Sequence, residues 1–200
     1  MDSITLEKYQ QLLDHYENKY TDFDLFFQNY EGLFVFSRLD IVFNVLKTLL
    51  EMNIININQK FIETGSGDGR IVALASIIGF EVYGIELSND MANISIGHIQ
   101  KLVEKKILIH TPKIIQGDFL KQETYDKLKC PFQDIDIFFN YYTSTELLVS
   151  KVIKRAKIGA ILISVSLSKR PVKTNLQIIY STDLPDLNHY LYVYKKNLIN

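Results

Sequence analysis

Three glycines that alternate within five residues are the part of this chain best suited to binding chemistry. Gly65, Gly67 and Gly69 follow a short apolar run that ends in Glu63, and an apolar helical pattern opens at Arg70. Glycine has no Cβ and adopts positive φ, so such a turn lets a ligand approach the backbone closely. The free N–H groups at the start of the next helix add a slightly positive end. The spacing therefore predicts a strand, a tight turn and a helix that together hold a nucleoside-type ligand.

The pattern around this turn predicts the elements that position it. From about residue 59, short apolar strands alternate with helices, which is typical of a parallel sheet covered on both faces. The last two strands have no helix between them and predict an antiparallel hairpin at one edge. Strands are expected at about 60–63, 81–86, 113–116, 135–140, 160–167, 176–180 and 189–194, and helices at 69–78, 88–106 and 144–156.

The first 55 residues are expected to form an N-terminal helical extension, and residues 56–200 the core, in a single domain overall. Apolar residues recur at helical spacing in two stretches of the extension. Ser37 is the expected N-cap of the second helix. The aromatic residues between 20 and 36 are expected either to pack these helices onto the sheet or to form a lid over the ligand, and packing is favoured.

Acidic residues at the ends of the next two strands extend the predicted site. Glu86 ends the second strand of the core and Asp118 follows the third. Ligands of open α/β sheets bind outside the carboxyl ends of the strands, so both acids are expected near the glycine turn. Glu86 suits the two hydroxyls of a ribose, and Asp118 an exocyclic amine of adenine, with Leu87 and Phe119 as apolar flanks of the base. Taken singly, Glu86 is explained equally well as a solvated loop acid, and Asp118 equally well as an N-cap or a turn former.

Composition narrows the class of protein. The chain has 200 residues, 47% of them apolar and 22% charged, with a net charge of −1. These values fit a globular protein and disfavour a nucleic-acid binder that works by neutralising phosphates, with a local basic patch as the alternative that net charge leaves open. Cys130 is the only cysteine and the four histidines show no ligand spacing, so no disulfide and no metal site are expected. No apolar run reaches about 18 residues and the first residues do not resemble a leader, so a soluble, cytoplasmic protein without membrane contact is expected.

The motifs as a group resemble a known family. E-T-G-S-G-D-G-R, then G-I-E-L and G-D-F, are similar to the S-adenosylmethionine-dependent methyltransferases of class I, and the resemblance covers about residues 58–170. It implies a seven-stranded Rossmann-like sheet with an antiparallel C-terminal hairpin and S-adenosylmethionine as cofactor. More narrowly, G-S-G-D-G-R-I and G-I-E-L are similar to the archaeal-type protein lysine methyltransferases, which are distant relatives of histone methyltransferases.

The resemblance also implies a role for each candidate residue. The methionine part and sulfonium of the cofactor would meet Glu63 and the turn, the ribose would meet Glu86, and the adenine would meet Asp118 and Phe119. The turn residues concerned are Gly65, Ser66, Gly67 and Gly69.

The chain departs from the family's pattern at Glu63 and on the acceptor side. Relatives commonly have Asp where Glu63 stands, and they read like L-Y-L-L-P where this chain has Asn140, Tyr141 and Tyr142. We assign acceptor-side roles to these three residues: Asn140 would orient an amine, and the two tyrosines would line a dry channel that favours a neutral lysine. The alternative for the tyrosines is packing at the entry of the next helix.

The favoured prediction is thus an S-adenosylmethionine-dependent methyltransferase that acts on protein lysine, with nucleic acid disfavoured as a partner. A methyltransferase with a small-molecule or RNA acceptor is one alternative. A cofactor-binding module without turnover is another, because the loop after Asn140 is altered. A nicotinamide dehydrogenase is the weakest alternative, since the turn lacks the spacing of G-x-G-x-x-G.

Overall fold

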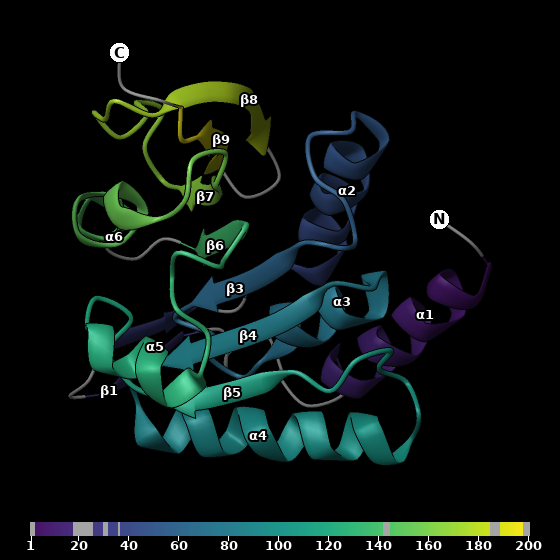
Figure 1. Cartoon of the computed structure of the whole chain (residues 1–200). Coiled ribbons are helices and arrows are strands. Elements are labelled where there is room, and N and C mark those ends of the chain that lie inside the picture. The colour runs from purple at the N-terminus through teal and green to yellow at the C-terminus, as the bar shows by residue number, and fades with distance from the viewer. Residues whose placement is uncertain are drawn as a thin grey trace.

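A computed structural model describes residues 3–17, 26–29, 32–35, 37–141, 145–184 and 189–197. Within these ranges, side chains are described for residues 3–16 and for residues from 37 onward. The protein is built on a seven-stranded sheet with the order β5-β4-β3-β6-β7-β9-β8 (Figure 1). Every strand runs parallel to its neighbours except β9, which is antiparallel to both β7 and β8. The strands are β3 (Lys60–Thr64), β4 (Glu81–Glu86), β5 (Lys113–Gln116), β6 (Ile137–Tyr141), β7 (Ile161–Ser166), β8 (Gln177–Leu184) and β9 (His189–Lys195).

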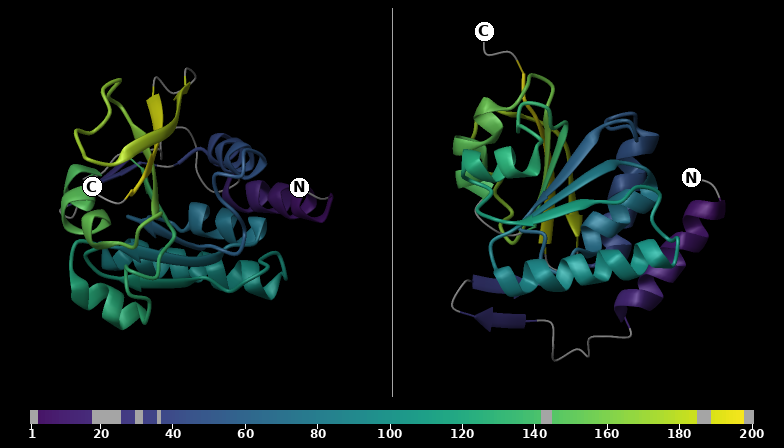
Figure 2. Two further views of the ribbon diagram at one scale, coloured as in Figure 1. Left: turned by 45° about the horizontal axis from the view of Figure 1, so that its top comes forward. Right: turned by 60° about the horizontal axis from the view of Figure 1, so that its bottom comes forward.

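Helices cover both faces of the sheet, as the two further views show (Figure 2). Alternate residues of each strand enter opposite cores, because successive side chains of a strand point to opposite faces. Phe61 joins the core under one set of helices, and its neighbour Ile62 joins the core under the other. The first set is α1 (Ser3–Glu17), α2 (Leu39–Glu51), α3 (Arg70–Ile78) and α4 (Asn89–Glu104); the second is α5 (Gln122–Leu128), α6 (Thr145–Lys151) and the short 3-10 helix η2 (Ile153–Arg155).

The strand order reverses at β3, which has β4 on one side and β6 on the other. The connections from β3 to β4 and from β4 to β5 run through α3 and α4 on one face, and those from β5 to β6 and from β6 to β7 run through α5 and α6 on the other. A crevice forms outside the carboxyl ends of the strands at such a point. The expected seven-stranded α/β sheet with its antiparallel C-terminal hairpin is confirmed, and the glycine turn lies where ligands bind in this architecture.

The structure also differs from the sequence-based expectations. The helix α5 was not predicted, and within the expected helical extension residues 26–29 and 32–35 form an antiparallel hairpin, β1 (Phe26–Asn29) and β2 (Gly32–Val35). Ser37 is not an N-cap, because α2 starts two residues later with Arg38 in that position and without a side-chain cap bond. The hairpin strand β9 inserts between β7 and β8, so β8 alone forms that edge of the sheet.

Candidate cofactor-binding site

The glycine turn adopts a backbone that only glycine tolerates well. Gly65, Gly67 and Gly69 have φ of 82°, 51° and 82°, which is the left-handed region. The N–H groups of Gly65 and Ser66 both donate to the carbonyl of Ile85, at 2.8 and 2.9 Å, and this ties the turn to β4. The first helical turn of α3 follows directly, with Gly69 as its N-cap. The turn is therefore held at the end of β3, where Gly65 is exposed and the residues from 66 to 69 are buried.

Crowding beneath the turn reinforces the need for glycine. A Cβ built on Gly69 would lie 2.2 Å from the hydroxyl oxygen of Ser95, which is on α4. One on Gly84 of β4 would lie 3.1 Å from Cβ of Ser66. Both serine hydroxyls are buried and have no hydrogen-bond partner among the described residues. The backbone of the turn thus packs against its support without room for a side chain at Gly69.

Glu86 lies against the turn, as the sequence predicted. Its Oε2 accepts a hydrogen bond from the N–H of Gly67 at 2.7 Å, and its Oε1 accepts from the N–H of Ser88 at 3.0 Å. The residue is half-buried. A carboxylate oxygen has room for more than one donor, so each oxygen retains a free acceptor direction. The two hydrogen bonds from the backbone fix the carboxylate at the end of β4, and the carboxylate can still accept further hydrogen bonds.

Glu63 is buried beside this carboxylate, with an exposed fraction of only 3%. Its Oε2 has no hydrogen-bond partner among the described residues. Burial raises the pKa of Glu63 well above its ordinary value, and the negative charges of Asp68 and Glu86 raise it further. A hydrogen bond from the Val72 backbone and the charge of Arg70 act in the opposite direction. The site therefore contains a buried acid that forms no ion pair with another described residue, and such an acid suits a cationic group of a ligand.

Asp68 is a residue that sequence reasoning did not select. It is 1% exposed, and its Oδ2 receives a hydrogen bond from Nη2 of Arg70 at 2.7 Å. The Arg70 guanidinium also lies over the ring of Tyr16 at 5.3 Å from the centroid, and the Tyr16 hydroxyl donates to the Asp68 carbonyl at 3.4 Å. The ion pair lies at the turn, and the two contacts of Tyr16 connect the turn to α1. The only sequence signal was an acid two residues before an arginine.

The rim after β5 lies beside Glu86. The N–H of Gly117 donates to the carbonyl of Glu86 at 2.8 Å. Oδ1 of Asp118 accepts from the N–H of Leu120 at 2.8 Å, which makes it a turn former as well as a candidate for adenine. Phe119 is partly buried against the core under α5, whereas Leu87 is 50% exposed. The candidate base-binding residues thus share the rim with the carboxylate of β4.

On the acceptor side, Asn140 is fully buried in a polar network. Its Nδ2 donates to the carbonyl and hydroxyl oxygens of Thr64 at 3.2 and 3.0 Å, and its Oδ1 accepts from the Thr145 hydroxyl at 2.8 Å. The Thr145 hydroxyl lies 3.2 Å from that of Ser164. Both ends of the amide are therefore engaged in joining β3, β6 and α6. In this arrangement the amide faces the protein interior rather than an acceptor.

The two tyrosines that follow differ in what the structure describes. Tyr141 is half-buried, and burial raises its pKa to about 12. Its ring centroid lies 6.3 Å from that of His189, so it packs beneath the hairpin. Tyr142 lies outside the described residues, as do residues 143 and 144.

Comparison with known proteins agrees with this architecture. No family model and no curated protein matches the chain. Among solved structures, an RNA methyltransferase from Salinibacter ruber in complex with S-adenosyl-L-homocysteine is 18% identical, with a TM-score of 0.56 over 78% of this chain and 93% of that one. A putative methylase from Haemophilus influenzae is 18% identical, with a TM-score of 0.57 over 77% and 97%. A tRNA (m1A58) methyltransferase from Aquifex aeolicus is 16% identical, with a TM-score of 0.56 over 84% and 80%.

The chain has a Rossmann-like methyltransferase fold. In this fold Glu63, the glycine turn and Glu86 lie at the carboxyl ends of β3 and β4, where strand order reverses and where ligands of open α/β sheets bind. The narrower resemblance to lysine methyltransferases finds no counterpart in the three descriptions above, two of which name RNA.

A hollow that does not belong to the candidate site lies at another place on the described residues. It measures about 550 Å³ and opens at the outer edge of β5, between α4 and the end of α5. Backbone geometry, rather than hollow size, therefore identifies the candidate site. The described residues contain no group of three or more metal-ligand side chains, and each of their helices is too short or too polar to cross a membrane.

Proposed function

We propose that this protein is an S-adenosylmethionine-dependent methyltransferase whose cofactor lies on the glycine turn. The observation that carries the proposal is the convergence of a turn with three left-handed glycines and the carboxylates of Glu63 and Glu86 at the strand reversal. The partnerless Oε2 of Glu63 fits a ligand that brings a positive charge. A nicotinamide dinucleotide would bring phosphates toward three acidic residues, which is electrostatically unfavourable.

Different residues of the site would contact different parts of the cofactor. Glu63 and the turn would meet its methionine part, and the free acceptor directions of Glu86 would meet the ribose hydroxyls. Asp118, Leu87 and Phe119 would surround the adenine. The cofactor supplies an activated methyl group, so the chain contributes chiefly by binding, orienting and excluding water.

For the acceptor, we infer RNA rather than a protein lysine. The lysine prediction came from the resemblance to lysine methyltransferases and gave Asn140 the role of orienting the amine, but both ends of that amide are engaged with Thr64 and Thr145. Two proteins of similar fold are described as methyltransferases of RNA. The local charge of this chain, developed below, favours the same acceptor class. Asn140 then becomes a positioning residue that braces β3 against α6.

Two measurements test the proposal. Thermal shift and calorimetry with S-adenosylmethionine, S-adenosylhomocysteine and NAD should detect binding of the first two only. Incubation with tritiated-methyl cofactor, total RNA, protein extract and a small-molecule fraction should then transfer label to RNA. Label in protein would return the lysine prediction to first place, and label in the small-molecule fraction would favour that alternative. Binding without any transfer would favour a module without turnover, and binding of NAD alone would refute the proposal.

A further inference from the structure

Charge is distributed unevenly along this chain. Residues 145–200 contain nine basic and three acidic side chains, a net charge of +6, whereas residues 1–144 contain 13 basic and 20 acidic ones, a net charge of −7. The overall charge of −1 averages two opposite regions. Such an asymmetry is typical of a protein that meets a polyanion with one part of its surface. The argument from net charge against nucleic acid therefore does not hold locally.

Six of these basic residues lie in two neighbouring segments, and one of the six, Arg155, lies over the ring of Phe132. The other five form what we call the basic strip: Lys151, Lys154, Lys169, Arg170 and Lys173. All five are exposed. None of them is in an ion pair with another described residue. Unpaired, solvated cations interact with a phosphate backbone without first breaking an internal pair.

The two segments of the strip are held side by side. The first is α6 with η2, and the second, residues 167–176, connects β7 to β8. The hydroxyl of Tyr192 donates to the carbonyl of Lys169 at 2.5 Å, and the N–H of Val172 donates to the hydroxyl of Tyr194 at 3.1 Å. The connecting segment is thus fastened onto the face of the sheet that α6 covers, and its cations are presented from a fixed backbone.

A small hollow lies between the two segments. It measures about 220 Å³, and Lys154 and Lys173 line it from opposite sides. Hydroxyl and amide side chains complete a lining that suits phosphate oxygens, since these accept hydrogen bonds from cationic and neutral donors alike. The other lining residues are Val149, Ser150, Thr174, Asn175 and Leu176.

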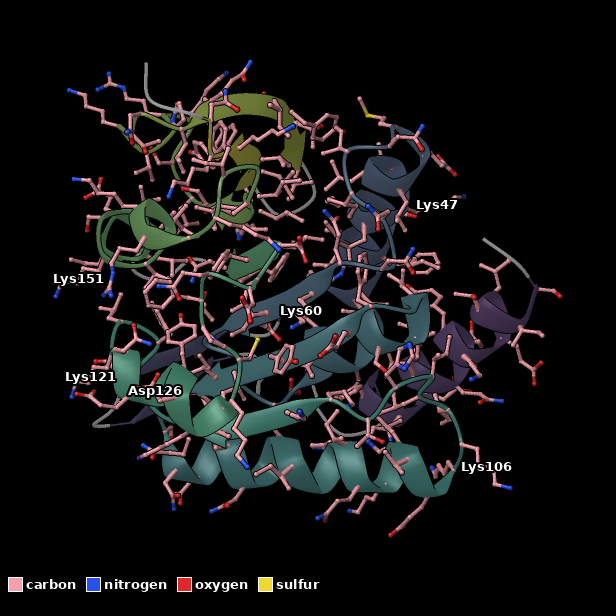
Figure 3. The ribbon with its side chains drawn as sticks, viewed as in Figure 1. Lys47, Lys60, Lys106, Lys121, Asp126 and Lys151 are labelled. Carbon is pink, nitrogen blue, oxygen red and sulfur yellow. The ribbon has the colours of Figure 1, made fainter. Side chains whose placement is uncertain are left out.

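The strip begins at the edge of the sheet that carries the candidate cofactor site. β7 runs parallel to β6, with Ser164 opposite Asn140, so the segment after Ser166 leaves from the same edge as the glycine turn. Lys151 projects on the side of the molecule where the arrows of β3 and β4 end, and Lys106 lies on the opposite side (Figure 3). A chain of phosphates along the strip would therefore lead toward the place where an acceptor meets the cofactor.

We propose that the basic strip binds the sugar–phosphate backbone of the RNA acceptor and feeds it to the methyl-transfer site. The inference rests on the proposed function, because it names the surface by which that site takes its substrate. The hollow between Lys154 and Lys173 seats one phosphate, and the remaining cations follow the backbone electrostatically. Sequence selection is left to residues nearer the site, since phosphate contacts position a nucleic acid without reading bases.

The test compares two charge-reversal variants that change net charge equally. Lys154→Glu/Lys173→Glu alters the strip. Lys101→Glu/Lys106→Glu alters the last turn of α4 and the turn just after it, and Lys106 lies on the side of the molecule opposite Lys151 (Figure 3). Binding of a fluorescein-labelled RNA hairpin is followed by anisotropy in saturating S-adenosylhomocysteine, from low to high salt. At about 50 mM salt the strip variant should lose at least about tenfold in affinity, and its slope of log K against log[salt] should be shallower by about 2. The far-side variant should stay within about twofold of the parent.

Each other outcome decides against one part of the reasoning. Equal losses in both variants would mean a general charge effect and would refute the strip as a surface. Stronger displacement by polyglutamate than by unlabelled RNA would assign the strip to an acidic protein. Calorimetry separates the two proposals: a protein that binds S-adenosylhomocysteine but not RNA refutes the strip alone. A protein that binds RNA but not that nucleoside refutes the methyltransferase proposal and leaves the surface standing.

Discussion

Replacing Glu63 with glutamine should strengthen the fold while weakening the site. The carboxyl group is buried, one of its oxygens has no hydrogen-bond partner among the described residues, and its pKa is raised by burial and by two neighbouring carboxylates. Glutamine keeps the shape of the protonated acid and removes its titration. The variant Glu63→Gln therefore separates two effects of this acid: its effect on the stability of the free protein and its effect on ligand affinity.

The magnitude follows from proton linkage. In the unfolded chain Glu63 releases its proton near pH 4.5, whereas the folded protein retains that proton to a higher pH. Between those two pKa values the folded state binds more protons, so the stability contributed by this group is complete below pH 4.5 and is lost as pH rises through the folded pKa. The loss is at most about 1.4 kcal/mol for each pH unit. Glu63→Gln lacks this loss, so its advantage over the parent should grow with pH.

Urea unfolding between pH 5 and pH 8 measures this difference. The matched control is Glu104→Gln, because Glu104 is an exposed acid on α4 whose replacement should shift stability by less than about 0.5 kcal/mol at every pH. Parallel pH curves for the parent and Glu63→Gln would refute the reasoning, since they would mean that the carboxyl titrates alike in the folded and unfolded states.

The same acid should couple cofactor binding to proton release. A cationic ligand stabilises the carboxylate, so binding of S-adenosylmethionine should expel the proton from Glu63 and tighten as pH rises. Calorimetry in two buffers of different ionisation enthalpy counts this proton. Glu63→Gln should bind more weakly and release none, and unchanged proton release would assign the linkage to another group.

Three further substitutions test the turn and its support. Glu86→Ala should weaken S-adenosylhomocysteine binding by at least about tenfold, because it removes a charged acceptor worth about 1.5–3 kcal/mol; an unchanged affinity would count against the ribose assignment. Gly69→Ala should lower the free energy of unfolding by about 1–2 kcal/mol for its left-handed backbone, and by more because the new Cβ clashes with the Ser95 hydroxyl. The control Gly97→Ala places a Cβ that meets nothing within 4 Å and should stabilise α4 by about 0.5–1 kcal/mol. Equal effects of the two variants in urea unfolding would contradict the packing argument. Asn140→Ala should destabilise the protein by about 2 kcal/mol, because it leaves buried polar partners unpaired; a neutral effect on unfolding, with a loss confined to turnover, would restore an acceptor-facing role.

The central strands were predictable because the sequence and the tertiary structure impose the same pattern on them. The expected strand over 81–86 coincides with β4, and the hydroxyl of Ser88 accepts from the N–H of Met91 as the predicted cap of α4. Strands buried on both faces read as short apolar runs, and the glycine turn follows the first of them. The position of Glu86 beside that turn follows from topology alone, since parallel neighbours end at one edge.

The elements that escaped prediction are those whose local signal is weak. The helix α5 is seven residues long and largely polar, and only Tyr125 and Leu128 are apolar residues that it buries. The hairpin β1–β2 lies in an aromatic stretch, and aromatic side chains suit a strand as well as a helix packed on a sheet. Asp68 escaped because its significance depends on Arg70 and Tyr16, which only the folded chain brings to it. The basic strip escaped because net charge carries no information on where charges gather.

The N-terminal extension and the core, which meet at about residue 55, both contribute to the candidate site. The last turn of α1 packs against α3 and α4, where Nε2 of His15 lies 2.9 Å from Nδ1 of His98 in a buried contact. The neighbouring Tyr16 contributes its ring to the Arg70 guanidinium and its hydroxyl to the Asp68 carbonyl. Without α1 the buried Asp68–Arg70 pair would meet water, and the turn between them would lose the contacts that hold it. The glycine turn therefore supplies the conformation of the proposed cofactor site, and the N-terminal helix holds that turn in place through the contacts of Tyr16.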